Sequence, residues 1–263
     1  MSKYVEFENP PVIEVVFGVL FSTPIPLKIA SIGLFWNLVR QDFNRIEEAA
    51  PLLPFMERYE FSYHQEPVSF DPAPRTWLLS ADGRMVLQIQ RDRFLLNWKK
   101  NEGDNSNTFY ESIAVKFEEY LRKFEEFLRS ENVGEIFYRQ FELTYINHID
   151  VLCGSEDGEN DLLVDHRRQR DPDRFLPAPE GYLWKTSYLL PDQIGRLHIV
   201  AQLVMVPPVM KKVTQLELTA RGLPKPTNNE GRKVWFDTAH EWIVKGFVDV
   251  TSPEWQERWG KKS

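Results

Sequence analysis

The chain has 263 residues, of which 42% are hydrophobic and 27% charged, a composition typical of a globular protein. Its formal net charge of −7 argues against direct binding to nucleic acid or anionic lipid, because binders of polyanions usually present a basic face. A single cysteine, Cys153, excludes an internal disulfide and fits a reducing compartment. No apolar run approaches the ~20 residues of a bilayer span and the N-terminus lacks a signal-peptide pattern, so we expect a cytoplasmic protein without a membrane anchor.

The first half of the chain predicts a strand, a helix, a three-strand meander and a second helix. The first strand runs from Val12 to Phe21, where the odd positions are all apolar and the even positions include Glu14. A proline-rich stretch at 51–74 indicates irregular chain. The other expected elements of this half are a helix at 27–48, strands at 77–80, 85–90 and 94–98, and an amphipathic helix from Tyr110.

The second half repeats this order, with a long strand at 137–151, strands at 182–190, 197–206 and 213–221, and a closing helix. That helix begins at "TNNE", where Thr227 and Glu230 have capping-box spacing. The fragments "DGRMVLQIQ" and "IGRLHIVAQ" place Gly83–Arg84 and Gly195–Arg196 in similar turns. The sequence predicts an α+β fold with a mainly antiparallel sheet and packed helices.

Two arrangements of this fold remain open. One is a duplicated strand–helix–three-strand–helix unit, and the other is a single sheet without internal symmetry. The halves would span residues 1–134 and 135–263, either as two units or as one fused domain.

No sequence motif for catalysis is present. The five histidines lack metal-ligand spacing, and the "HEW" at His240 is followed by Val244 where a zinc protease has its second histidine. Phosphate-binding glycine motifs and a serine nucleophile elbow are also absent from the sequence. We therefore expect no metal and no cofactor, assign no catalytic residue, and favour a non-catalytic protein over an enzyme with an unrecognised site.

Polar residues alternate along the long strand of the second half. Gln140, Glu142, Thr144 and His148 share one of its faces, and Glu14 lies on a strand that could pair with it. If these faces meet those of Gln88, Gln90 and Asn97 in the meander, they form a polar concavity suited to binding a ligand or a peptide. The alternative is an ordinary solvent-exposed sheet face. Glu142 and His148 are ~20 Å apart along the strand and cannot act as a catalytic pair.

Basic residues cluster in "DHRRQRDPDR", which contains Arg167, Arg168 and Arg170. Because aspartates alternate with the arginines, the segment can be a solvated loop that neutralises its own charge. The alternative is an arginine clamp for a phosphate or carboxylate group of a partner.

Four blocks resemble a bacterial protein family of about this length that is named for its sporadic distribution across genomes: "NPPVIEVVFGVLF", "VLQIQRDRFLLNW", "FELTYINHI" and "HEWIVKGFVDVTSPEWQERWG". The resemblance spans the whole chain but brings no activity and no catalytic residues. Sporadic occurrence implies mobile accessory genes, such as those of defence or toxin systems. Within the blocks, Glu14, Asn147 and His148 are candidates for either structure or binding, and His240 and Glu241 are expected near a rim.

Two functions follow as expectations. The first is a non-catalytic interaction protein, for example an accessory, inhibitor or antitoxin-like partner of a protein encoded nearby, with exposed tryptophans as anchors. The second is a sensor that binds a small ligand between the two halves.

Overall fold

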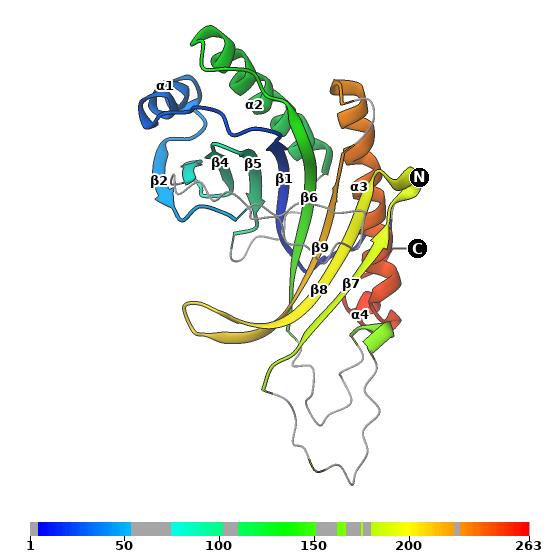
Figure 1. The fold of residues 1–263 in the computed structure, drawn as a ribbon. Helices are drawn as coiled ribbons and strands as arrows, with labels where there is room; N and C mark the ends of the chain where they lie inside the picture. Colours follow the sequence, from blue (N-terminus) through cyan, green and yellow to red (C-terminus); the bar gives the residue numbers. More distant parts are fainter. Residues whose placement is uncertain are drawn as a thin grey trace.

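The computed structural model describes residues 5–53, 75–101, 110–150, 162–166, 175, 180–223 and 227–262. Its strands are β1 (Val12–Phe21), β2 (Arg45–Ala49), β3 (Arg75–Leu79), β4 (Met85–Gln90), β5 (Arg93–Lys99), β6 (Tyr138–Ile149), β7 (Leu183–Leu189), β8 (Gly195–Val206) and β9 (Lys211–Gly222). They form one nine-stranded antiparallel sheet in the order β2-β3-β4-β5-β1-β6-β9-β8-β7 (Figure 1). The helices are α1 (Ile29–Val39), α2 (Tyr110–Ser130), α3 (Asn229–Val250) and α4 (Pro253–Arg258). The predicted α+β fold is confirmed.

Two local predictions are wrong, and one short helix was not predicted. The helix expected at 27–48 ends at Val39, and its last part forms the edge strand β2, because pairing with β3 overrides the helical spacing of apolar residues. Asn228, not Thr227, caps α3, since the Asn228 side chain accepts a hydrogen bond of 2.8 Å from the backbone N–H of Gly231. Helix α4 was not expected, and Pro253 begins it at a position where proline is favoured.

The two halves have the same strand order, β3-β4-β5-β1 and β7-β8-β9-β6, and meet where β1 pairs with β6. Arg196, Arg221 and Glu142 stand side by side on β8, β9 and β6. Arg84, Lys99 and Glu14 have the same arrangement beside β4, on β5 and on β1. This register places Gly83–Arg84 and Gly195–Arg196 in equivalent connections, as a duplicated unit requires. The sheet continues across the expected boundary at residues 134 and 135.

Helices α2 and α3 cover one face of the sheet and run antiparallel to each other. Phe17 of β1 contacts Phe117 of α2 and Phe236 of α3, at ring-centroid distances of 5.4 Å and 5.2 Å. The apolar stripe that predicted α2 therefore faces β1 and α3. Helix α1 packs on α2 through Phe35, whose ring lies 5.0 Å from that of Phe124. A single core joins both halves.

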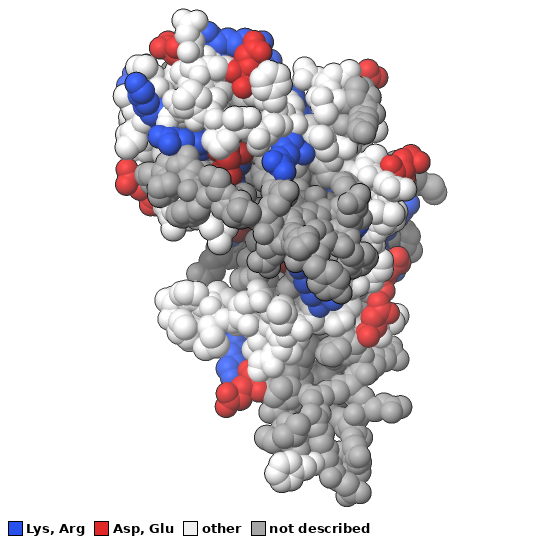
Figure 2. Space-filling view, in the orientation of Figure 1, with Lys and Arg blue, Asp and Glu red and all other residues white. Residues whose placement is uncertain are grey.

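The described surface carries charges of both signs. Figure 2 shows acidic and basic side chains interspersed on the described part of the face that it presents. Mixed charge of this kind gives no strong long-range attraction to a polyanion. Among the described residues, no helix combines the length and the hydropathy that crossing a bilayer requires.

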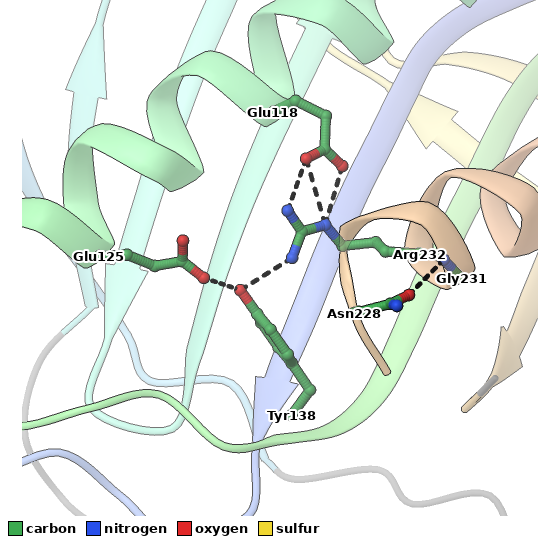
Figure 3. A network of polar contacts seen from close by, with 6 residues as sticks. All are labelled: Glu118, Glu125, Tyr138, Asn228, Gly231 and Arg232. Atoms are coloured by element: carbon green, nitrogen blue, oxygen red, sulfur yellow. Dashed lines mark hydrogen bonds and ion pairs between the residues drawn. The ribbon is translucent and has the colours of Figure 1, made fainter. Parts of the chain in front are cut away.

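A buried arginine joins the two helices that cover the sheet. Arg232, in the first turn of α3, is 2% exposed and donates to both carboxylate oxygens of Glu118 on α2, at 2.6–3.2 Å (Figure 3). It also donates to the hydroxyl of Tyr138 at 3.0 Å, and that hydroxyl donates in turn to Glu125 of α2 (Figure 3). The carboxylate of Glu118 raises the pKa of Arg232 above its ordinary value despite burial of the guanidinium. The network thus compensates a charge that the fold removes from water.

Replacing Glu118 with Gln is expected to lower the free energy of unfolding by about 3 kcal/mol, because a buried guanidinium then loses its carboxylate partner. Chemical denaturation of both proteins measures the difference. Lys233→Ala is the matched control on the same helix, since Lys233 is 74% exposed in its ion pair with Asp237 and should cost less than about 0.5 kcal/mol. Equal losses in the two variants would contradict a stabilising role for the buried network.

Candidate functional site

The predicted polar face exists on the side of the sheet opposite α2 and α3. Directly paired residues share a face, and Thr144, Glu142 and Gln140 pair with Val16, Gly18 and Leu20 of β1. Glu14 precedes these β1 residues and lies on the same face of the strand. His148 follows Thr144 on β6, and these two residues also share one face. The alternation in the sequence therefore placed Glu14, Gln140, Glu142, Thr144 and His148 correctly relative to one another.

In the first half, the polar side chains form a connected chain across four strands. Asn97 donates to the carboxylate of Glu14, and Gln88 donates to the Asn97 carbonyl oxygen at 2.6 Å. Arg75 and Trp77 then donate to the Gln88 carbonyl oxygen at 2.7 Å and 3.1 Å. Lys99 lies 3.9 Å from the Glu14 carboxylate. Glu14 is thus held by side chains of the neighbouring strand, which is the structural role that the sequence left open.

In the second half, polar side chains of β6 on the same face of the sheet interact with side chains of β9. Glu142 accepts from Arg221 at 2.5 Å, and the Thr144 and Thr219 hydroxyls are 2.9 Å apart. His148 Nε2 lies 3.2 Å from Gln215 Oε1. Each of these side chains bonds to a partner on β9, so they form a ladder and do not converge on one point. A role in binding stays a prediction for this face.

Of the remaining predicted site residues, the structure describes Asn147 alone. Asn147 faces α3, on the opposite side of the sheet, and its Nδ2 donates to the Leu216 carbonyl at 3.0 Å. Arg167, Arg168 and Arg170 lie outside the described residues, as does Cys153.

A pocket of about 380 Å³ lies between α3, the start of α2, the sheet and the N-terminal segment. One face of α3 forms its longest wall, with side chains one and two helical turns apart. The opposite wall comes from β6 and from the chain before β1. The walls include His240, Ile243, Val244 and Phe247 of α3, Tyr145 and Asn147 of β6, Tyr110 of α2, and Phe7, Pro10 and Pro11.

The N-terminal wall is held in place by the C-terminal segment. Phe7 pairs with Lys261 in an antiparallel bridge, and Glu8 N donates to Gly260 O at 3.0 Å. Gly260 has φ +70°, and a Cβ at this position would lie 2.9 Å from the Glu8 side chain. Glycine is therefore required where the two segments approach each other.

Three rings form the polar end of the pocket. His240 stacks on Tyr110, with ring centroids 4.0 Å apart and planes at 5°. Its Nδ1 lies 3.0 Å from the Tyr145 hydroxyl, and Tyr110 donates to Asp237 Oδ1 at 3.0 Å. His240 is only 8% exposed, so its expected place near a rim is wrong. Tyr110 comes from the first half of the chain, whereas His240 and Tyr145 come from the second.

The polar side chains that the structure describes in the buried part of the pocket are uncharged. Burial lowers the pKa of His240 to about 4, despite the nearby carboxylates of Glu111, Asp237 and Glu241. The imidazole is thus uncharged at neutral pH. Three charged side chains are found among the described residues that line the pocket, those of Glu6, Glu111 and Lys262, and all three are exposed.

The pocket offers uncharged hydrogen-bonding groups within apolar walls. Among the described residues, no group of three His, Cys, Asp or Glu side chains is arranged to hold a metal ion. A neutral imidazole, two phenols and a carboxamide can donate and accept hydrogen bonds inside apolar walls. The sequence signal for the α3 wall is the spacing of His240, Ile243, Val244 and Phe247, but nothing local in the sequence indicates which segments face it.

Comparisons with known proteins do not assign the chain to a family, since no family model and no curated protein matches it. The resemblance of the four sequence blocks stays a prediction, and the functional conclusion rests on the geometry of the pocket.

Stability should depend on pH through His240. The unfolded chain protonates this histidine below about pH 6.5, whereas the folded protein keeps it neutral down to about pH 4. The free energy of unfolding should therefore fall as the pH falls through this window, by up to ~3 kcal/mol from this group, and the loss should be absent above it. Urea denaturation of wild type and His240→Phe across the window measures the difference in slope.

His148→Phe serves as the control, because His148 lies on the opposite face of the sheet. The loss of stability that His240 causes in this pH window should persist in this variant. An unchanged slope in His240→Phe would show that His240 is not held neutral in the folded protein.

Proposed function

We propose that the protein is a sensor that binds a small molecule in the pocket between its two halves. The observation that carries this proposal is the pocket itself, whose volume of about 380 Å³ falls in the usual range for ligand sites. Its walls are mainly apolar, and a few neutral polar groups converge at Tyr110, Tyr145 and His240. Apolar walls with a small number of placed polar groups are the usual composition of ligand sites.

A ligand in this pocket would contact both halves at once. Tyr110 begins α2, while His240 lies in the middle of α3 and Tyr145 lies on β6. A molecule that touches these residues would favour the arrangement in which α2, α3 and β6 are packed together. A ligand that binds one conformation more tightly than another shifts the equilibrium between them. This shift is how a sensor can signal that its ligand is bound.

One surface feature favours the second candidate, an interaction protein. The outer side of α1 exposes Ile29, Leu34 and Leu38 at 71%, 55% and 59%. A helix with exposed apolar side chains can contribute to a protein interface. The tryptophan anchors expected for this function are not available, because each of the eight tryptophans is buried or half-buried. The pocket therefore supports ligand binding more strongly than the surface supports a protein partner.

Filling the pocket tests the ligand-binding function. Val244 lines the pocket from α3, so Val244→Trp should occupy part of its volume. We expect a screen of metabolites by thermal shift to find compounds that raise the melting temperature of the wild type, because a ligand that prefers the folded state stabilises it. The same compounds should bind Val244→Trp at least about tenfold more weakly.

Val234→Trp is the matched control, since Val234 lies on the same helix, is 59% exposed and does not line the pocket. This variant should respond to ligands like the wild type. If no compound stabilises the wild type, or if the shifts survive in Val244→Trp, the pocket is not a ligand site.

A further inference from the structure

Asn147 is the most buried hydrogen-bonding side chain of the pocket wall, at 4% exposure. It uses one N–H of Nδ2 to donate to the Leu216 carbonyl at 3.0 Å. Its Oδ1 makes no hydrogen bond to any described residue. Oδ1 is also not one of the described side-chain atoms that are fully buried without a partner, so it stays accessible inside the pocket. Oδ1 is therefore an acceptor that a bound molecule can satisfy.

The other described polar side chains of the pocket interior carry no charge. Tyr145 and His240 meet in a neutral hydrogen bond, and His240 stacks on Tyr110. Lys262 and Glu6 lie 3.6 Å apart in an exposed ion pair. Glu111 also lines the pocket and is exposed, as Glu6 and Lys262 are. An ionised group carried into the buried part of the pocket would lose its water without gaining an opposite charge there, which is strongly unfavourable.

We propose that the pocket selects uncharged ligands with an apolar body and an N–H or O–H donor that bonds to Asn147 Oδ1. This inference rests on the proposed ligand-binding function and narrows its ligand to a chemical class. Primary amides and other neutral donors fit the class. Carboxylates do not fit, because they bring a negative charge and no donor to a carbonyl oxygen.

The apolar side chains of α3 define where the apolar part of a bound ligand would lie. Ile243, Val244 and Phe247 extend the α3 wall away from His240, and Phe247 packs edge-on against Phe7 at 5.7 Å. His240 and Phe247 are seven positions apart on α3, which spans ~10 Å of helix. A flat body of one ring and a short chain matches that length.

Three molecules of the same shape and different charge test the selectivity. Cinnamamide is neutral, whereas cinnamate is an anion and cinnamylamine a cation at neutral pH. Titration calorimetry or ligand-observed NMR with the full chain should give cinnamamide an affinity at least about tenfold higher than either charged analogue. A higher affinity for cinnamate or cinnamylamine, or no binding of cinnamamide at millimolar concentration, would overturn the inference.

Two variants at position 147 test the role of the side chain. Asn147→Leu removes the acceptor and should weaken cinnamamide binding about tenfold. Asn147→Asp keeps the shape, adds a negative charge and should shift the preference toward cinnamylamine. Circular dichroism checks that both variants fold. If both retain the wild-type preference, Asn147 does not set the selectivity.

This outcome can be separated from failure of the ligand-binding function. Compounds that stabilise the wild type and lose affinity in Val244→Trp, but are all anions, would leave the function in place and overturn the selectivity. If no compound loses affinity in Val244→Trp, the ligand-binding function and the selectivity for uncharged ligands are both overturned.

Discussion

The antiparallel pairing of β1 with β6 joins the two halves of the chain, and every other element is placed by it. Each strand carries apolar side chains toward the helices, among them Phe17 on β1 and Phe141 on β6. These residues meet the same aromatic group, because both rings contact Phe236 of α3. A slip of one residue in this register would turn the apolar set of one strand toward the polar face. The helix layer, the polar face and the pocket therefore depend on one register.

Arg232 adds specificity to that arrangement. A guanidinium that is 2% exposed needs its partners in one geometry, and Glu118 and Tyr138 provide them from α2 and β6. Apolar contacts between α2 and α3 tolerate small shifts, whereas a bidentate ion pair does not. We infer that the network fixes how far α3 lies along α2, and hence where His240 meets Tyr110.

The sequence predicted those elements whose signals are local. Period-two alternation located β1 and β6 and assigned their faces correctly, and the apolar stripe located α2. It could not predict β2, since its pairing with β3 depends on residues far along the chain. Arg232 looks like an ordinary basic residue of a helix, because its burial depends on Glu118. The pocket was also hidden, because its walls come from segments that only the sheet and helices bring together.

The repeated register also lets the two halves be compared position by position. With Glu14 equivalent to Glu142, the residues that follow on the helix-facing side correspond as Phe17 to Tyr145 and Val19 to Asn147. In the first half both side chains are wholly buried in the core, at 0% exposure. In the second half, a hydroxyl and a carboxamide stand at the corresponding places, and a cavity lies beside them. The first half thus has a packed interior at these positions, whereas the second half has hydrogen-bonding groups beside a cavity.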